Sequence, residues 1–313
     1  MSTVKDFYHV MQSHGPIAIG RRVYTEMTKD DVFTNAAAMA YAWVFAVFPM
    51  IIFLMSLVPY LPKDFRDAIP EYIATIMYQS GMTYAIVDPV QTTAKSLLNE
   101  THGGLLSFGL LLTLYAASGG MNTTMSSLDA ALDIDKPRPF WLKRLIAMAL
   151  TLFMGVAFFI VIVMLPVGAL LTALLSKYVH LLPGFAQEWA TTRMFVVTTI
   201  VRYVIGLTAM QLMIGVLYQL GPSRRQRLRF FTVGSIFTAI GWIATGIALQ
   251  FYFTHFNSYS KTYGTVAGMV IMLMVFYLDA AVILIGAELD NEVMKARYET
   301  PPADAKPAAT AVA

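Results

Sequence analysis

The feature that most constrains this chain is its last hydrophobic stretch, from Tyr263 to Val293, which combines an apolar run of membrane length with an acidic residue deep inside it. The 22 residues from Val266 to Ala287 cover about 33 Å as a helix, which is enough to cross a hydrocarbon core of about 30 Å. Asp279 then lies near the bilayer centre, where a carboxylate costs at least about 2.5 to 3.5 kcal/mol on insertion scales. Its side chain should therefore face protein or a water-filled cavity and should have a polar partner.

The composition of the chain also indicates a membrane location. Apolar residues make up 57% of the 313 positions and charged residues 13%, about half of the roughly 25% typical of soluble domains. Apolar runs recur between residues 36 and 287 and leave no block long enough for a separate soluble domain. The formal net charge of +3 is too small to indicate nucleic-acid binding. We expect one membrane domain and no nucleic-acid partner.

The apolar runs predict an all-α polytopic integral membrane protein with six transmembrane helices and short amphipathic surface helices. The predicted spans lie at about residues 36–61, 104–120, 145–175, 194–220, 230–253 and 266–287. They form a transmembrane domain over residues 36–292. An amphipathic segment over residues 1–35 precedes this domain, and a tail over residues 293–313, rich in Pro and Ala and expected to be disordered, follows it.

The ends of the spans and the segments between them carry further signals. The first span opens with AAAMAYAW at residues 36–43, a small-residue face that permits close contact with another helix. The second span is expected to end at the Ser-Gly-Gly sequence of residues 118–120, followed by a polar amphipathic segment that stops at Pro137. Residues 62–104 are expected to form an aqueous loop with one surface helix, around residues 69–78.

Lysine and arginine are unevenly distributed between the two sides that six spans define. The two termini, the loop between spans two and three and the loop between spans four and five hold 15 of these residues, whereas the opposite loops hold 6. By the positive-inside rule, both termini are predicted to be cytoplasmic. The strongest contribution comes from a cluster of four arginines after span four, which we call the arginine cluster: Arg224, Arg225, Arg227 and Arg229.

The arginine cluster has two interpretations. It could bind the headgroups of anionic lipids, which the cytoplasmic leaflet supplies. Alternatively, it only sets the direction in which the helices insert. A nucleic-acid site would need basic residues interleaved with stacking aromatic residues over a sizeable surface, which a short loop between two spans does not provide.

Asp279 and Arg202 are the two charged residues inside predicted spans. Counted from the same side of the membrane, their depths differ by about 8 Å at the helical rise of about 1.5 Å per residue, a gap that an extended arginine nearly bridges. One interpretation is a buried charge pair that lines a polar pathway for a substrate headgroup or a proton. In the alternative, Arg202 reaches outward to the interface and Asp279 bonds to Ser, Thr or Tyr of a neighbouring helix.

Two further residues complete the candidate substrate pathway: Gln211 in span four and Glu288 at the end of span six. Gln211 could instead form an ordinary interhelical hydrogen bond. Glu288 opposes the dipole at the C-terminal end of its helix, so it should have a partner, such as Arg144 or the arginine cluster. The alternative for Glu288 is a solvated helix end.

The sequence gives no support for catalysis. It contains no Cys, which excludes disulfides, thiolate nucleophiles and Cys-based metal sites. Its five His residues are scattered without HExxH spacing, so we expect no metal site and no cofactor. Neither a phosphate-binding glycine loop with its lysine nor a GxSxG nucleophile turn occurs. We therefore predict that the protein is not an enzyme.

Several motifs together resemble the YihY/BrkB family of bacterial inner-membrane proteins. The matching sequences are AAAMAYAWVFAVFP at 36–49, PRPFWLKR at 137–144, GPSRRQRLR at 221–229, KTYGTVAG at 261–268 and LIGAEL at 284–289. Their order and spacing match over most of residues 30–292. The chain departs from the family pattern at Asp279, where a small polar residue would be expected. The role of Asp279 is therefore not taken from the family.

The resemblance implies a six-helix protein of the bacterial inner membrane. Members of the family have been suggested to export or transport material, lipids or lipid-linked molecules among the candidates, and the former label ribonuclease BN is regarded as mistaken. We therefore expect a transporter or exporter of a lipid-like or anionic amphipathic substrate, with membrane lipids as partners. An ion- or proton-coupled transporter of small solutes is the alternative, and a membrane enzyme is the third hypothesis. The oligomeric state stays open.

Overall fold

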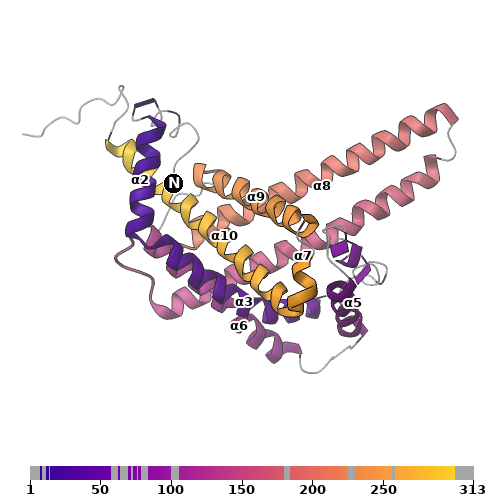
Figure 1. Ribbon diagram of the computed structural model, residues 1–313, viewed down its shortest axis with the longest axis horizontal. Helices are drawn as coiled ribbons and strands as arrows, with labels where there is room; N and C mark the ends of the chain where they lie inside the picture. Colours follow the sequence, from indigo (N-terminus) through magenta and orange to yellow (C-terminus); the bar gives the residue numbers. More distant parts are fainter. Residues whose placement is uncertain are drawn as a thin grey trace, which may run out of the picture.

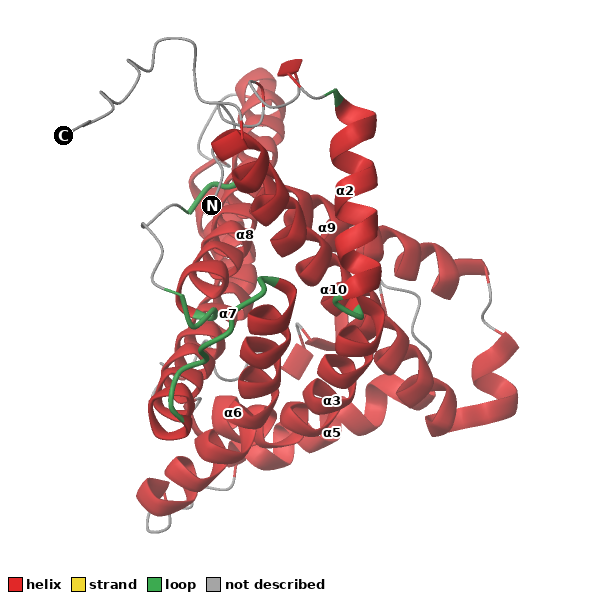
Figure 2. Ribbon diagram, turned by 90° about the vertical axis from the view of Figure 1, so that its left-hand side faces the viewer, coloured by secondary structure: helices red, strands yellow, loops and turns green. Residues whose placement is uncertain are grey.

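The computed structural model describes residues 15–57, 84–99, 106–179, 184–224, 230–255 and 258–299, with isolated residues outside these ranges. Some side chains within the helices are also outside the described set, among them those of residues 160–195 and Arg202. Every described element is a helix (Figures 1 and 2), which confirms the all-α prediction. The helices are α2 (Pro16–Lys29), α3 (Val32–Leu57), α5 (Tyr84–Asn99), α6 (Leu106–Ala131), α7 (Phe140–Val179), α8 (Gly184–Leu220), α9 (Val233–His255) and α10 (Ser258–Glu299).

Five stretches of the described helices are long and apolar enough to cross a membrane. They are Val32–Met50, Phe140–Phe159, Thr199–Leu220, Val233–Tyr252 and Gly268–Arg297, and they belong to α3, α7, α8, α9 and α10. The chain is therefore a polytopic membrane protein. The predicted span at residues 104–120 lies mostly on α6, whose first side chains are outside the described residues, so the number of six spans stays a prediction.

Helix α6 does not end at the Ser-Gly-Gly sequence of residues 118–120, as the sequence analysis expected, but continues to Ala131. The last residue of this sequence, Gly120, lets α6 lie close to α3. A Cβ atom at Gly120 would lie 2.9 Å from the Cβ of Ala46 and 3.4 Å from the carbonyl oxygen of Ala42. Glycine inside a membrane helix commonly marks such a close approach. The predicted contact face at the start of span one is thus in place, and Ser-Gly-Gly serves helix packing.

Two other segments differ from the predictions. Helix α10 continues to Glu299, so residues 293–299 are helical, and the predicted disordered tail of residues 293–313 was wrong for that part. The physical reason is burial: Val293 and Ala296 pack against Ile19 and Val23 of the amphipathic helix α2. Residues 300–313 lie outside the described residues. The loop between the first two predicted spans contains α5, a helix that was not predicted.

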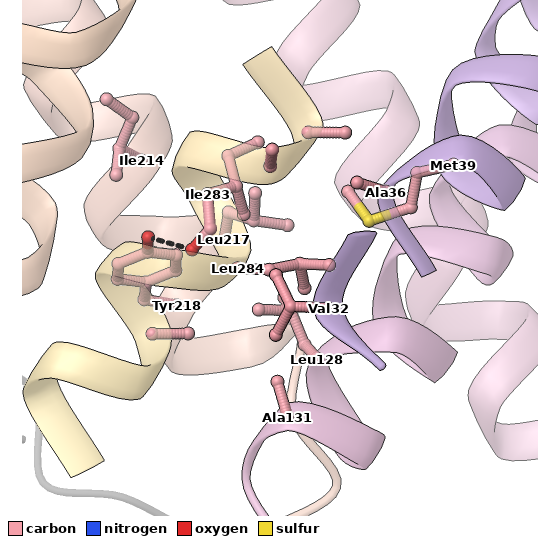
Figure 3. Packing of buried hydrophobic residues seen from close by; sticks show 13 residues of the cluster. Val32, Ala36, Met39, Leu128, Ala131, Ile214, Leu217, Tyr218, Ile283 and Leu284 are labelled. Atoms are coloured by element: carbon pink, nitrogen blue, oxygen red, sulfur yellow. Dashed lines mark hydrogen bonds between the residues drawn. The ribbon is translucent and has the colours of Figure 1, made fainter. Parts of the chain in front are cut away.

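Helix α10 forms the centre of the bundle and packs against α9, α3, α2 and α6. Its side chains Ile283 and Leu284 are completely or almost completely buried. In the core they belong to the same cluster as Val32 of α3, Leu128 of α6 and Tyr218 of α8 (Figure 3). The hydroxyl of Tyr218 donates a hydrogen bond to the carbonyl oxygen of Ile283 (Figure 3). Helix α10 therefore connects four of the other helices, whereas α7 and α8 pack mainly against each other and against α6 and α9.

Helices α7 and α8 pack along each other, and their connected ends extend away from the other helices (Figure 1). With 40 and 37 residues, they are about 60 and 55 Å long at the helical rise. This is roughly twice the thickness of a hydrocarbon core. The predicted spans at residues 145–175 and 194–220 cover only part of each helix.

Helices α9 and α10 cross at glycine residues that bring the two backbones into contact. A Cβ atom at Gly234 of α9 would overlap the carbonyl oxygen of Gly286 of α10. A Cβ at Gly286 would in turn overlap the hydroxyls of Thr238 and Tyr218. The glycine of the LIGAEL motif is therefore required by the distance between these helices.

We predict that Gly234→Ala lowers the free energy of unfolding by roughly 2 to 3 kcal/mol, the usual cost of forcing extra volume into a packed interior. Gly246→Ala, on the same helix, is the control, because a Cβ there meets nothing within 4 Å. It should be neutral or slightly stabilising, by up to about 1 kcal/mol. Thermal unfolding of the purified protein in detergent measures both. Equal melting temperatures for the two variants would contradict the assigned crossing.

Candidate functional site

Polar and charged side chains gather at one end of the bundle, which we call the charged end. The end of α2, the turn between α6 and α7, the turn between α8 and α9 and the last turns of α10 meet there. Its members are Glu26, Lys29, Asp30, Asp129, Asp133, Arg138, Lys143, Ser223, Glu288, Asp290, Glu292 and Lys295. Such groups are costly inside lipid, so this end belongs at a membrane surface.

Asp129, near the C-terminal end of α6, is the centre of a first network. One of its carboxylate oxygens accepts the backbone N–H of Ser223 at 2.6 Å. The other accepts the Ser223 hydroxyl at 2.8 Å and the Lys143 ammonium at 3.0 Å. The side chains of Asp129 and Lys143 are only 7% and 13% exposed, so this ion pair is shielded from water. Asp129 thereby joins α6, the start of α7 and the turn after α8.

Arg138 satisfies carbonyl groups at the C-terminal end of α8. Its guanidinium donates to the carbonyl oxygens of Leu220 at 2.8 Å and Gly221 at 3.2 Å, and its backbone N–H donates to the Ser223 hydroxyl at 3.0 Å. A cation is favourable here because the last carbonyls of a helix lack partners and carry the negative end of its dipole. The PRPFWLKR and GPSRRQRLR motifs therefore bind each other.

Asp290 of α10 accepts a hydrogen bond from the N-terminal end of α9, as Arg138 donates to the C-terminal end of α8. Its Oδ1 accepts the backbone N–H of Gly234 at 2.9 Å. The first N–H groups of a helix have no partner within the helix, and a carboxylate there also meets the positive end of the dipole. Asp290 follows the LIGAEL motif directly, so the glycine of this motif and the acid just after it together position α9.

Five carboxylates from three elements form a second network, which we call the acid cluster: Glu26, Asp30, Asp133, Glu288 and Glu292. The ammonium of Lys29 lies 2.9 Å from Glu26 and 3.3 Å from Asp133. The ammonium of Lys295 lies 2.9 Å from Glu292 and 3.5 Å from Asp133. Two ammonium groups thus contact three of the five carboxylates.

Asp30 and Glu288 are the members of the acid cluster without an ammonium contact among the described residues. Their carboxyl groups lie within hydrogen-bonding contact of each other. Glu288 is fully buried, and no described donor reaches either of its oxygens or Oδ2 of Asp30. Burial raises the pKa of Asp30, because loss of water disfavours the charged carboxylate, and the contact with Glu288 partly offsets this rise.

The expected pairing of Glu288 with Arg144 was wrong. Arg144 faces α6, where its guanidinium donates to the carbonyl oxygen of Tyr115 at 2.6 Å and stacks over the ring of the same residue at 3.9 Å. The solvated helix end that was the alternative is also wrong, because Glu288 is buried. The sequence did not indicate that α2 folds back over the end of α10, which is what covers Glu288.

Asp279 lies on α10 beside α9 and is partly buried. Its carboxyl group is within hydrogen-bonding reach of the Thr245 hydroxyl, and its backbone carbonyl accepts the indole N–H of Trp242 at 3.3 Å. The carboxylate oxygen Oδ1 is buried without a described donor. The side chain of Arg202 is outside the described residues, so the predicted Asp279–Arg202 pair stays a prediction.

Gln211 links α8 to the start of α9. Its side-chain amide donates to the carbonyl oxygen of Phe230 at 3.0 Å and to the hydroxyl of Ser235 at 2.7 Å. This is the interhelical hydrogen bonding that the sequence analysis gave as the alternative to a pathway role. Gln211 and Glu288 therefore do not form one site with Asp279 through any contact between described side chains.

In the arginine cluster, Arg224 is exposed, and Arg225, Arg227 and Arg229 lie outside the described residues.

We predict that Asp129 and Lys143 are energetically coupled. Asp129→Asn leaves a shielded ammonium without its counter-charge and should lower the free energy of unfolding by about 3 kcal/mol, as breaking a buried ion pair does. With Lys143→Gln as the second change, the double variant should lose at least about 1 kcal/mol less than the sum of the single variants. Thermal unfolding in detergent measures all three. Asp135→Asn, an exposed acid in the α6–α7 turn, is the control, and additive losses would contradict the coupling.

Comparison with known proteins places this chain in a family. The family model described as Virulence factor BrkB matches residues 23–311. The ribonuclease-like protein YfkH of Bacillus subtilis is 30% identical over 282 residues, covering 90% of this chain and 96% of that protein. A UPF0761 membrane protein of Xanthomonas axonopodis pv. citri is 22% identical over 294 residues, and a second of Xanthomonas euvesicatoria pv. vesicatoria is equally similar. The chain spans 63% and 62% of the lengths of these two relatives.

No solved structure matches the chain. The family match includes all of the charged end, from the last turns of α2 to the end of α10. It also includes the motifs from which the resemblance to the YihY/BrkB family was inferred, so that inference is confirmed. The chain belongs to the Virulence factor BrkB family of proteins.

Proposed function

We propose that the protein is a transporter or exporter of the bacterial inner membrane that handles a lipid-like or anionic amphipathic substrate. The observation that carries this proposal is the placement of Asp279. Its carboxyl group faces Thr245 of α9, and one of its oxygens is buried without a described donor. An acid inside a membrane helix is costly and is retained where it serves a substrate or ion pathway. The polar neighbour makes such a pathway between α9 and α10 physically possible.

Ion- or proton-coupled transport of a small solute is the second candidate, and a specific contact favours it. The Thr245 hydroxyl has one proton, and it donates this proton to the carbonyl oxygen of Gly241 at 3.0 Å. While the hydroxyl donates to Gly241, a hydrogen bond between Thr245 and Asp279 needs a protonated carboxyl group; if the hydroxyl turns to Asp279 instead, it stabilises the carboxylate. Asp279 is therefore suited to bind and release a proton, which a coupled transporter needs.

We propose no nuclease activity, although the Bacillus subtilis relative carries a ribonuclease-like name. Proteins that bind single-stranded RNA combine basic grooves with aromatic side chains that stack on the bases. Two grooves at the charged end have volumes of about 410 and 520 Å³. The described residues that line them include at least as many acidic as basic residues and no aromatic one. Cleavage of RNA by the purified protein would overturn this proposal.

We further propose that the charged end is cytoplasmic. Helix α2 and the end of α10 pack together there, so the two terminal helices lie on one side of the membrane. The lysine and arginine bias of the sequence assigns that side to the cytoplasm.

Reporter fusions test this orientation. An alkaline phosphatase fused before Met1 or after Ala313 should be inactive, because that enzyme needs the periplasm, and a green fluorescent protein at either position should be fluorescent. A phosphatase inserted between residues 180 and 183, at the far end of the α7–α8 pair, should be active. Active phosphatase at a terminus would refute the assignment.

Transport is measured with the purified protein in liposomes. Movement of fluorescent anionic phospholipid between leaflets without a pH gradient is expected from the first candidate, and proton-dependent uptake of a solute is expected from the second. In either case Asp279→Asn should slow the movement about tenfold, the effect of roughly 1.4 kcal/mol on a barrier. Glu71→Gln changes an exposed acid between α3 and α5; it is the control and should transport like the parent protein.

The predicted partner of Asp279 is tested in the same assay. If Arg202 pairs with Asp279, then the Asp279→Asn and Arg202→Gln double variant should be milder than the two single effects combined. Equal activity of Asp279→Asn and the parent protein, in both lipid and solute assays, would remove the support for both candidates.

A further inference from the structure

Three carboxylates of the acid cluster converge in a way that suits a cation. One oxygen each from Glu26, Asp30 and Asp133 lie within 4.8 Å of one another. Hard divalent cations bind carboxylate oxygens at about 2.0 to 2.6 Å, so oxygens on opposite sides of such an ion are separated by up to about 5 Å. Glu26 and Asp30 are partly buried and Asp133 is exposed, so an ion could enter from the solvent.

The backbone around these residues favours a positive charge as well. Asp30 is the C-terminal cap of α2, and Asp133 follows the last residue of α6 by two positions. The C-terminal ends of two helices therefore meet at the same place. Each such end carries the negative pole of the helix dipole, equivalent to roughly half an elementary charge. The repulsion among two negative helix ends and several carboxylates favours the binding of positive charge at this place.

Glu288 provides an independent indication of a missing positive charge. Its side chain is 0% exposed, and no described donor reaches either carboxylate oxygen. It lies in contact with Asp30, one of the three converging acids. Among the described residues, the five carboxylates of the acid cluster contact two ammonium groups, those of Lys29 and Lys295. Burying unpaired charge in this way is costly, so a further cation would stabilise the cluster.

From these observations we propose a binding site for one hard divalent cation, of the Mg²⁺, Ca²⁺ or Mn²⁺ class, at the charged end. Its ligands are Glu26, Asp30 and Asp133. Glu288, beneath Asp30, supplies the buried negative charge that the ion compensates. A bound ion would fasten α2 and the α6–α7 turn to the centre of the bundle. The proposal does not depend on the transport function.

Lys29 occupies part of the proposed ion site. Its ammonium bridges Glu26 and Asp133, two of the three ligands, and therefore competes with an incoming ion. Its side chain is 58% exposed, so it can turn into solvent when an ion binds. Removal of this ammonium should strengthen ion binding, whereas removal of a carboxylate should weaken it.

The experiment titrates the purified full chain in phosphatidylcholine nanodiscs, which contain no anionic lipid, with Mn²⁺. Electron paramagnetic resonance reports the free Mn²⁺, and Mg²⁺ and Ca²⁺ are then added as competitors. We expect one bound Mn²⁺ per chain. Glu288→Gln and Asp30→Asn should each weaken binding by at least about tenfold, the lower bound for disturbed metal sites. Lys29→Met should tighten it.

Matched controls separate this effect from misfolding. Asp135→Asn changes an exposed acid two positions from Asp133 and should bind Mn²⁺ like the parent protein. Glu288→Gln removes a like charge beside Asp30, so without Mn²⁺ it should melt at a temperature no lower than that of the parent protein. Absence of bound Mn²⁺ in the parent protein, or binding that Glu288→Gln leaves unchanged, would overturn the site. A transport assay that fails while Mn²⁺ binding holds would count against the proposed function alone.

Discussion

Helix α10 can occupy the centre of this protein because several of the polar groups that it carries into the interior meet another helix. In lipid no water is available for this purpose, so the partners must be supplied by the chain itself. The Ile283 carbonyl meets the Tyr218 hydroxyl, Asp290 meets the first N–H groups of α9, and Glu288 meets Asp30. The positions of α8, α9 and α2 around α10 are largely set by these three contacts.

The same requirement explains three of the motifs that carry the resemblance to the family. Arg138 of PRPFWLKR binds the carbonyl groups of Leu220 and Gly221, which lie 82 and 83 residues later and precede and begin GPSRRQRLR. Asp129, which belongs to neither motif, holds the same turn through Ser223. LIGAEL provides the glycine at the α9–α10 crossing and the buried Glu288. These motifs are places where helix ends are joined, and none of them has the character of a catalytic signature.

The sequence predicted the helical class and the approximate position of most membrane helices, because long apolar runs carry that information in their length alone. It predicted less well where helices end. Ser-Gly-Gly has the composition of a terminator, but in α6 it is a contact with α3, and the distinction depends on a neighbour that is far away in the sequence. The acid cluster was missed for a similar reason. Glu26, Asp133 and Glu288 are separated by more than 100 residues each, and neither periodicity nor spacing brings such residues together. Asp279, in contrast, was singled out by one physical argument, the cost of an acid within an apolar run.

The packing of α2 against the last turns of α10 also bears on how the molecule is made. Arg22 and Glu299 form an ion pair at 2.9 Å across 277 residues of sequence. Helix α2 leaves the ribosome long before the end of α10 is synthesised, so its packing partner does not yet exist for most of that time. Contacts of such long range form late and slowly. The packing of α2 against the end of α10 is therefore expected to form late in biogenesis, and a nascent protein truncated before α10 would leave the apolar face of α2 uncovered.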